Sequence, residues 1–583
     1  MEKLKGATVV SHGITQQLCE RIATRWLNGI AETNPAILAV FSDRDVRPYR
    51  DLLAWSGEFA GKYLTGAYFV WRQTGDEQLK AYVLNFIERL LKLQDSDGYF
   101  GCFSRATRFT GALPQTPDKR PWTWDLWGNY HIAFGLLLWH KAVGEERYFR
   151  AVEKLAELVR SSFYGEKENI VAAGCSEMNL AVYHLFGILY NATGEKKYFE
   201  FMRNIEEDMQ RPESGNWLEL LASGGRFCDS SKPRWESLHI LMGFKEAYAA
   251  TGDKKYLTAL SRAVKSIFET DVHNTGGFST HERAIGTPYE NGTIETCCVV
   301  AFDALVLELY KLTGEPSLID FLERAHYNAA MGAVSPSGAW ATYDTPMEGE
   351  KFANFHGCDF QSRPGGPMLN CCSVNFPRGV AESEEWSVAE DEAGIYLNGF
   401  EPKEISREGL RLKIESNYPA ENRILIFCEA EGEKKKIFLR IPNWSKNTRL
   451  VVNGEIRSVR SGEYVRLPQN CKAEFFPDFS VRFEKGGGDY SEKYSIFRGP
   501  VLFAWDVSFN PDFSDRNGGT GFTTAERLNE LNLPVLRFSD FERAEYRKEE
   551  GKIEMILPGG AVLVDFFHAG ETGGLYKTWL SVQ

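Results

Sequence analysis

The run EAYAATGDKKYLTAL at residues 246–260 shows how most of this chain is built. Gly252 is placed to end one helix, because glycine readily takes the left-handed position that closes a helix C-terminus. Asp253 follows it and suits the positive N-terminal end of a second helix. Tyr256 and Leu260 begin an apolar face at helical spacing in that second helix. The run therefore predicts two helices joined by a short turn.

The same pattern occurs five times in the N-terminal part of the sequence. The turn glycines are spaced 50 to 69 residues apart: Gly75, Gly144, Gly194, Gly252 and Gly314. Open helical solenoids have shorter repeats of roughly 34–47 residues. Together with a further helix expected at residues 14–30, the long period predicts a closed (α/α)6 barrel over residues 1–385. Its longer loops should gather at one end and form a cleft.

After about residue 385 the pattern changes to short runs in which apolar and polar residues alternate, such as RLKIESN at 411–417. The pair Asn453-Gly454 is a strong hairpin signal. We expect a β-sandwich over residues 386–490 and a second β-rich module over 491–583 that packs on the barrel. The segment TVVSHG at residues 8–13 could add a strand to this region. The predicted fold class is α+β and multidomain.

Composition excludes several classes of function. The formal net charge is -13, and the chain has no Lys/Arg cluster that could neutralise nucleic-acid phosphates. No apolar run of about 18 residues is present, so no membrane span is expected. The N-terminal residues lack the apolar core of a secretory signal. Whether a signal peptide was removed from this sequence is left open. The 11 cysteines include two adjacent pairs. This pattern is more typical of reduced thiols in the cytoplasm than of a disulfide framework.

Two short thiol motifs are the strongest local signal: Glu295-Thr-Cys297-Cys298 and Asn370-Cys371-Cys372-Ser373. Thiolates are soft ligands that suit zinc, and three of them with a carboxylate make a sensible donor set. Residues two apart do not face one another on a helix, so the chain must turn between Glu295 and Cys297. The spacing is not that of a common zinc finger. The alternative is that these cysteines are small core residues.

Three further residues are candidates for contact with a substrate. Glu282 lies in the Gly- and Thr-rich loop GGFSTHERAIGTPYENG at 276–292, where a buried carboxyl group could act as general acid and base. His131 and His239 lie on predicted helices among Trp and Tyr residues, a combination that can hold sugar hydroxyls. The plainer interpretation is a solvated loop carboxylate and two core histidines.

Taken in order, these motifs and several others resemble one family. They comprise Glu282 after a Gly-Gly loop, Glu-Thr-Cys, LERAHYNA, ATYDTPMEG, Asn-Cys-Cys-Ser, FLRIPNW, VVNGE and RGPVLFA. The series is similar to that of the bacterial β-L-arabinofuranosidases of glycoside hydrolase family 127 and close relatives. The resemblance covers nearly the whole chain, from the WGNYHI helix to the RGP strand.

The resemblance implies a retaining exo-glycoside hydrolase that releases a terminal furanose, with β-L-arabinofuranose as the best candidate. By order in the motifs, Glu295, Cys297, Cys371 and Cys372 match the ligands of a Zn²⁺ ion. Cys371 matches the nucleophile and Glu282 the acid/base. Zinc would keep the attacking thiol deprotonated near neutral pH.

The resemblance also implies sugar contacts and shows two departures from the family pattern. Positions that match sugar-contacting residues are His131, His239, Glu323 and Tyr343. Cys175 stands where relatives carry the His of a Gly-His pair, and the residues around Tyr343 differ from the usual Tyr-x-Asn-Pro. Both departures leave the identity of the sugar open.

Three alternatives remain at this point. The same machinery could act on another pentose-like or branched acidic sugar. A different (α/α)6 enzyme, such as a sugar epimerase or an unsaturated uronyl hydrolase, would use no catalytic metal. The third alternative is a glycan-binding protein without enzymatic activity. Its zinc site would be closed and structural, so its cysteines would not react with an electrophilic sugar. The expected partner is a glycan or oligosaccharide, with no nucleic acid or membrane, and a homodimer stays open.

Overall fold

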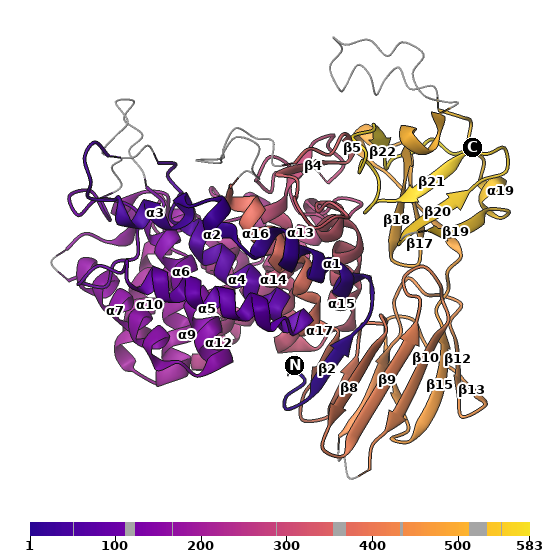
Figure 1. The fold of residues 1–583 in the computed structure, drawn as a ribbon, viewed down its shortest axis with the longest axis horizontal. Coiled ribbons are helices and arrows are strands. Elements are labelled where there is room, and N and C mark those ends of the chain that lie inside the picture. The colour runs from indigo at the N-terminus through magenta and orange to yellow at the C-terminus, as the bar shows by residue number, and fades with distance from the viewer. Residues whose placement is uncertain are drawn as a thin grey trace.

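The protein is a mixed helical and β-sheet molecule of several parts (Figure 1). The computed structural model describes residues 1–49, 52–110, 123–165, 167–286, 288–353, 369–431, 435–511, 533–549 and 551–583. Helices form the N-terminal part, drawn from indigo to magenta, and sheets form the orange and yellow C-terminal part. No helix in these ranges is both long enough and apolar enough to cross a membrane.

The five predicted pairs of helices joined by short turns are confirmed. Each turn glycine has a left-handed φ between 67° and 72° and ends the first helix of a pair. The amide of Gly252, for example, donates a hydrogen bond to the Tyr248 carbonyl at 2.8 Å. The pairs are α4 (Glu58–Thr74) with α5 (Glu77–Leu91), α6 (Asp125–Val143) with α7 (Glu146–Ser162), α9 (Val182–Thr193) with α10 (Lys196–Met209), α12 (Ser237–Thr251) with α13 (Lys254–Thr270), and α14 (Thr296–Thr313) with α15 (Pro316–Ala325).

The first helix of each pair joins α16 (Cys371–Ala381) in a ring. Among the described residues, each helix contacts the next in the order α4, α6, α9, α12, α14 and α16, and α16 contacts α4 again. The N-terminal ends of α4, α12, α14 and α16 border one cavity, whereas the C-terminal ends of α4, α6, α12 and α14 border another. These helices therefore run in the same direction, with their N-terminal ends gathered at one place.

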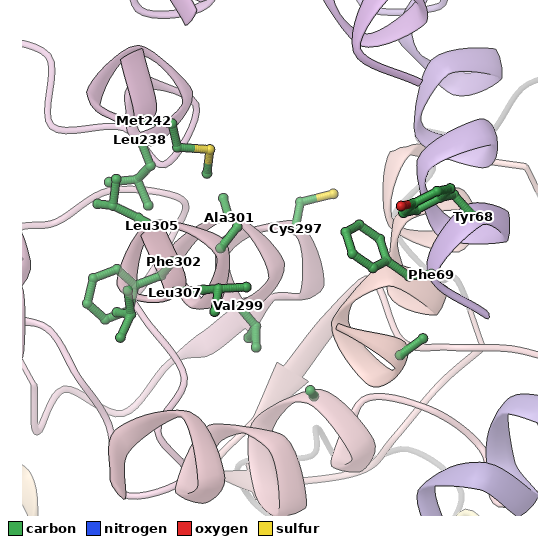
Figure 2. Close-up of a cluster of buried hydrophobic side chains, with 14 of the residues drawn as sticks. Tyr68, Phe69, Leu238, Met242, Cys297, Val299, Ala301, Phe302, Leu305 and Leu307 are labelled. Carbon is green, nitrogen blue, oxygen red and sulfur yellow. The ribbon is translucent and has the colours of Figure 1, made fainter. Parts of the chain in front are cut away.

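Much of the interior of the ring is apolar, although the ring helices also bury charged side chains such as Lys62, Asp303 and Arg378. Helix α14 is buried on nearly every side, as expected for a helix surrounded by others. Figure 2 shows Phe302 and Leu305 of α14 beside Leu238 and Met242 of α12, with Cys297 at the N-terminal end of α14. The helix expected at residues 14–30 begins as α1 (Ile14–Ile22) and continues as a π-helical turn, η1 (Ala23–Leu27).

Two sheets form the next part of the molecule, and the strands of the larger one are labelled at the lower right of Figure 1. A seven-stranded sheet in the described chain has the order β13 (Glu455–Arg457), β12 (Arg449–Val452), β15 (Cys471–Phe476), β10 (Ile424–Glu429), β9 (Leu410–Ser416), β8 (Lys403–Arg407) and β2 (Thr8–Ser11). A five-stranded sheet has the order β1 (Glu2–Lys3), β6 (Val388–Glu390), β7 (Gly394–Leu397), β11 (Lys436–Arg440) and β14 (Tyr464–Leu467).

Two local predictions about these sheets are confirmed. The N-terminal segment forms strand β2 and pairs with β8, with Val9 opposite Ile405. Asn453 and Gly454 have positive φ values of 52° and 85° and connect β12 to β13. Positive φ at both turn positions is what the Asn-Gly hairpin signal predicts.

A third sheet lies at the C-terminal end of the chain. Within the described residues its strands are β16 (Val481–Lys485), β17 (Tyr494–Arg498), β18 (Val501–Asp506), β21 (Val562–Asp565), β20 (Lys552–Ile556) and β19 (Glu545–Glu549), in that order, with β22 (Tyr576–Lys577) and β5 (Glu348–Gly349) at the side. Strand β5 comes from the helical part of the sequence and pairs with β22, so this sheet reaches back toward the ring (Figure 1).

A buried arginine joins the helices to the sheets. Arg440 of β11 is fully buried and forms ion pairs with Asp320 at 2.5 Å and Glu323 at 2.7 Å, both on α15. Glu323 also accepts hydrogen bonds from the Tyr418 hydroxyl at 2.7 Å and the Trp444 indole at 3.1 Å. The carboxylate of Glu323 thus holds α15 against the sheets.

Replacing Arg440 should destabilise the protein strongly. Arg440→Met leaves the buried carboxylate of Glu323 without its cation, and breaking a buried pair in this way costs about 3–5 kcal/mol. Thermal unfolding followed by calorimetry measures the loss. Arg457→Met, which removes an exposed pair with Glu455, is the control and should change stability by less than about 0.5 kcal/mol. Equal unfolding temperatures for the two variants would contradict this role of Arg440.

Candidate active site

The structure brings the four sequence-predicted metal ligands together. Ligand atoms of Glu295, Cys297, Cys371 and Cys372 all lie within 4.8 Å of one another, and all four residues are buried. Cys372 Sγ is 3.4 Å from Glu295 Oε1 and 3.6 Å from Cys297 Sγ. Cys371 Sγ is 3.6 Å from Glu295 Oε1 and 3.8 Å from Cys372 Sγ.

These distances suit a tetrahedral metal ion. Zn²⁺ with bonds of ordinary length would place two sulfurs roughly 3.8 Å apart, and a sulfur and an oxygen roughly 3.6 Å apart. The four distances given above match this spacing, so three thiolates and one carboxylate could share one metal ion. Cys298, the neighbour of Cys297, is not one of the four grouped residues; its sulfur accepts a hydrogen bond from the Ser279 hydroxyl at 3.5 Å and lies 3.9 Å from Glu295 Oε2.

Two helix N-termini present the thiols. Cys371 and Cys372 open α16, whose N-terminal cap is Asn370. The Asn370 side chain accepts from the Ser373 amide, and the Ser373 hydroxyl accepts from the Asn370 amide, both at 2.9 Å. Cys297 lies in the first turn of α14. The positive ends of both helices favour thiolates at these positions.

A short strand pair places Glu295 and Tyr343 beside the thiols. Strand β3 (Thr293–Glu295) leads directly into α14 and pairs with β4 (Asp344–Pro346), with Glu295 opposite Asp344. The amide of Thr296 donates to the Tyr343 carbonyl at 2.8 Å. The chain therefore changes from strand to helix between Glu295 and Cys297, which is the turn that the sequence spacing requires.

The electrostatics of the cluster are uneven. Burial raises the pKa of the Cys371 and Cys372 thiols well above the ordinary value. Burial also raises the pKa of the Glu295 carboxyl, and the charge of Cys297 adds to that shift. Burial opposes ionisation of Cys297 too, but hydrogen bonds from Cys371 and Cys372 and the charge of Lys62 bring its pKa well below the ordinary value.

A cavity of about 240 Å³ opens beside the cluster. Its aromatic lining is Trp55, Trp124, Trp235 and Tyr343. Its charged and thiol lining is Glu58, Arg234, Glu236, Glu282, Glu295 and Cys371. Aromatic walls with a few carboxyl groups are the lining expected for a small polar ligand with apolar faces, such as a sugar.

Glu282 reaches this cavity on a strained loop. Ser279, His281 and Glu282 all have left-handed φ values, of 68°, 53° and 65°. Residues other than glycine rarely adopt this conformation, and it concentrates where a site needs a particular orientation. The Glu282 carbonyl accepts a hydrogen bond from the Trp235 amide at 3.3 Å, which ties the loop to the start of α12.

Arg234 orients the Glu282 carboxylate. Its guanidinium contacts Glu282 Oε2 at 2.7 Å and grips both oxygens of Glu236, at 2.7 and 3.0 Å. Glu236 is fully buried, and burial raises the pKa of its carboxyl although Arg234 acts against the shift. The three side chains form a fixed group on one wall of the cavity.

The two predicted histidines lie behind the aromatic wall. His131 and His239 pack edge to face at 5.1 Å, and both pack against Trp127. Burial lowers the pKa of both rings well below the ordinary value, so they are neutral at pH 7. His239 Nδ1 lies 3.1 Å from the Tyr130 hydroxyl, whereas His131 Nε2 is buried with no hydrogen-bond partner among the described residues.

Neither Cys175 nor Glu323 belongs to the described cavity lining, although Cys175 contacts Trp124, which does. The Cys175 sulfur is hydrogen-bonded to Trp124, and burial raises the pKa of its thiol to about 12. The carboxylate of Glu323 contacts Arg440, Tyr418 and Trp444 at the junction with the sheets, and its contact with the sugar stays a prediction.

The sequence analysis missed several residues of the site. Lys62 and Glu58 lie one turn apart on α4, both 1% exposed, with Lys62 Nζ 3.6 Å from Cys297 Sγ and 3.0 Å from Glu58 Oε1. A charged pair four residues apart in the otherwise apolar run EFAGKYLTGAYF is a signal that could have identified them. The pair Arg234 and Glu236 precedes the His239 helix and carried no comparable signal.

Comparison with known proteins identifies the class. Residues 28–385 match the model of the β-L-arabinofuranosidase GH127 catalytic domain, and residues 394–474 match the GH127 middle domain. A search of curated protein sequences found no match.

Solved structures show the same fold. The GH127 β-arabinofuranosidase BT3674 is 18% identical, with a TM-score of 0.77 over 100% of this chain and 97% of that one. A GH127 β-L-arabinofuranosidase from Geobacillus stearothermophilus T6 is 15% identical, with a TM-score of 0.75 over 99% and 100% of the two chains. A structure described as a glycoside hydrolase is 16% identical, with a TM-score of 0.70 over 99% and 98%.

The protein is therefore a glycoside hydrolase, as its carboxylate-lined cavity and these matches indicate. The family model covers more than half of the chain, and the chain belongs to the GH127 β-L-arabinofuranosidase family, as the sequence motifs predicted.

Metal binding should depend on Cys372 and not on Cys298. Cys372→Ser removes one of four ligands, so it should lower the metal content of the purified protein well below one ion per chain. Cys298→Ser removes a buried thiol one residue from a ligand and should leave the metal content unchanged. Elemental analysis after gel filtration measures both. Equal metal loss in the two variants would show that the cluster is not the metal site.

Proposed function

We propose that the protein is a retaining exo-glycosidase that releases terminal β-L-arabinofuranose, with Cys371 as nucleophile and Glu282 as acid/base. The observation that carries the proposal is the position of Cys371. Of the three cluster cysteines, it is the one that lines the cavity in the described part of the chain, and it shares that cavity with Glu282. A closed structural metal site would not place a ligand thiol on a substrate cavity.

The donor set supports Zn²⁺ as the metal. Three thiolates and one carboxylate at tetrahedral spacing favour zinc over hard cations such as Mg²⁺, which prefer oxygen ligands. Glu295, Cys297, Cys371 and Cys372 would hold it. When bound, zinc supplies the positive charge that keeps the buried thiols ionised near neutral pH.

The reaction proceeds in two displacements. The Cys371 thiolate attacks the anomeric carbon and forms a C–S bond while the C–O bond to the leaving group breaks. Glu282 donates its proton to the leaving oxygen. Glu282, now a carboxylate, then takes a proton from water, whose oxygen attacks the anomeric carbon and displaces the sulfur. Two inversions give net retention, as in carboxylate-based retaining enzymes.

Local contacts divide the other roles. Arg234 holds the Glu282 carboxylate in one orientation, so that the same oxygen can serve both proton transfers. Tyr343 lies on the cavity wall beside Cys371, where its hydroxyl can bond the sugar. His131 and His239 do not line the cavity in the described part of the chain; they pack behind its wall on Trp127 and Trp235 and hold these rings in place.

The cavity favours release of one terminal sugar. Its volume of about 240 Å³ is below the roughly 300–1,000 Å³ of pockets for drug-sized ligands, so one small sugar fits. Trp55 and Trp124 stand together in its wall with ring centroids 5.1 Å apart and can stack on the leaving group. We further propose that the closed ring of helix pairs is an (α/α)6 barrel and that the two sheets of residues 388–476 form a β-sandwich.

Hydrolysis of an aryl β-L-arabinofuranoside by the zinc-loaded protein tests the proposal. The wild type should release the aryl alcohol, and Cys371→Ser should lower kcat by at least about 10³-fold, because a serine hydroxyl is a poor replacement for an activated thiolate. Cys298→Ser is the matched control and should retain activity.

Activity in Cys371→Ser equal to that of the wild type would exclude the cysteine nucleophile. No turnover by a wild type with zinc fully bound would exclude arabinofuranose as the sugar and direct attention to the neighbourhood of Cys175 and Tyr343.

A further inference from the structure

The three thiols of the cluster have different surroundings. Cys371 faces the cavity, whereas Cys297 faces nitrogen donors inside the ring. Lys62 Nζ lies 3.6 Å from Cys297 Sγ, and Asn375 Nδ2 donates to the same sulfur at 3.4 Å. Lys62 comes from α4 and Asn375 from α16, so two neighbouring helices of the ring contact one sulfur.

Lys62 is held in this place from several sides. It is 1% exposed and forms an ion pair with Glu58 at 3.0 Å. Its ammonium also lies over the rings of Trp235, at 5.0 Å, and Trp127, at 5.7 Å. A buried ammonium is costly unless anions offset its desolvation. Glu58 offsets part of this cost, and the Cys297 sulfur, which is a thiolate when it binds a metal ion, also contacts the ammonium.

The charge of the occupied cluster gives Lys62 a function. Four anionic ligands around one dication leave two negative charges in a buried site. Such a site needs further positive charge or hydrogen-bond donors nearby, and partners of this kind commonly change metal affinity 10–100-fold.

We propose that Lys62, together with Asn375, is a positioning residue that anchors Cys297 as the permanent metal ligand and leaves Cys371 as the thiolate free to react. Donors on the Cys297 sulfur reduce its nucleophilicity and hold its direction, so that the cluster keeps one firm thiolate while another forms and breaks a bond to the sugar. The inference rests on the zinc occupancy of the proposed function.

Zinc affinity tests the inference without any substrate. Competition with a chromophoric chelator measures the dissociation constant of the full-length protein. Lys62→Met keeps the length and apolar contacts of the side chain and should weaken zinc binding by about tenfold or more. Lys403→Met is the control, because Lys403 is also buried but lies in β8 beside Glu401; its affinity should stay within about twofold of the wild type.

A double variant separates this role from simple pairing with Glu58. If Lys62 served only to neutralise Glu58, then Glu58→Gln combined with Lys62→Met would restore zinc affinity to the wild-type value. The inference predicts that the double variant stays weakened, because the contact with Cys297 is still missing. Restored affinity in the double variant, or unchanged affinity in Lys62→Met, would overturn it.

Cobalt provides a spectroscopic signature. In the Co²⁺-loaded protein, loss of the ammonium should raise the energy of the sulfur lone pairs, so the thiolate-to-cobalt band of Lys62→Met should move to longer wavelength. An unmoved band would contradict the contact. If Lys62→Met does not fold, Asn375→Leu removes the second donor and should weaken zinc binding several-fold, and an unchanged affinity there would equally overturn the inference.

Failure of this inference and failure of the proposed function give different results. A wild type that binds zinc normally but hydrolyses no arabinofuranoside contradicts the proposed function and leaves the role of Lys62 open to the affinity test. A wild type that binds no zinc overturns both.

Discussion

The proposed site depends on one constraint: acidic groups that are buried close together need nearby positive charge to stay ionised. One carboxylate and three thiols meet within 4.8 Å, away from water. Burial alone protonates such groups, and the raised pKa values of Glu295, Cys371 and Cys372 show this. Two helix N-termini and the ammonium of Lys62 supply positive charge that acts against this effect, and the dication proposed for the site would supply more. The arrangement of the ring provides the helix N-termini and the lysine.

The ring of parallel helices explains why so many functional side chains converge. Since the ring helices run in one direction, Glu58, Glu236, Cys297 and Cys371, which lie at or near helix starts, gather at one end. Glu282 comes from the loop that precedes α14 in the sequence, and Tyr343 comes from the segment that follows α15. The three large sheets contribute no residue to the described cavity lining, and their role at the junction is to hold α15 through Arg440.

Local signals predicted those parts of the structure that depend on local physics. The five turn glycines marked the helix pairs because a left-handed C-terminal residue is a requirement of the backbone itself. The spacing from Glu295 to Cys297 required a turn, and the strand-to-helix junction supplies it. The four cluster residues were identified as candidate metal ligands because closely spaced cysteines are rare and chemically specific.

Long-range contacts could not be predicted in the same way. Glu323 stands in a motif that resembles a sugar-contacting one, yet Arg440, more than a hundred positions later, occupies its carboxylate. Lys62 lies more than two hundred positions before Cys297, so no local pattern connects the two. The ion pair between Arg234 and Glu282 depends on the strained loop that carries Glu282. The residue types of that loop did not predict its positive φ values.

The most direct test of the account is to trap the sugar on the enzyme. Glu282→Gln should still form the covalent adduct from an aryl β-L-arabinofuranoside with a good leaving group, which needs no proton, but should hydrolyse it slowly because the second step lacks its base. Peptide mass spectrometry of the zinc-loaded variant should then find one anhydropentose on the peptide that contains Cys371. The same mass on a carboxylate peptide, or no adduct despite release of the aryl alcohol, would contradict the account.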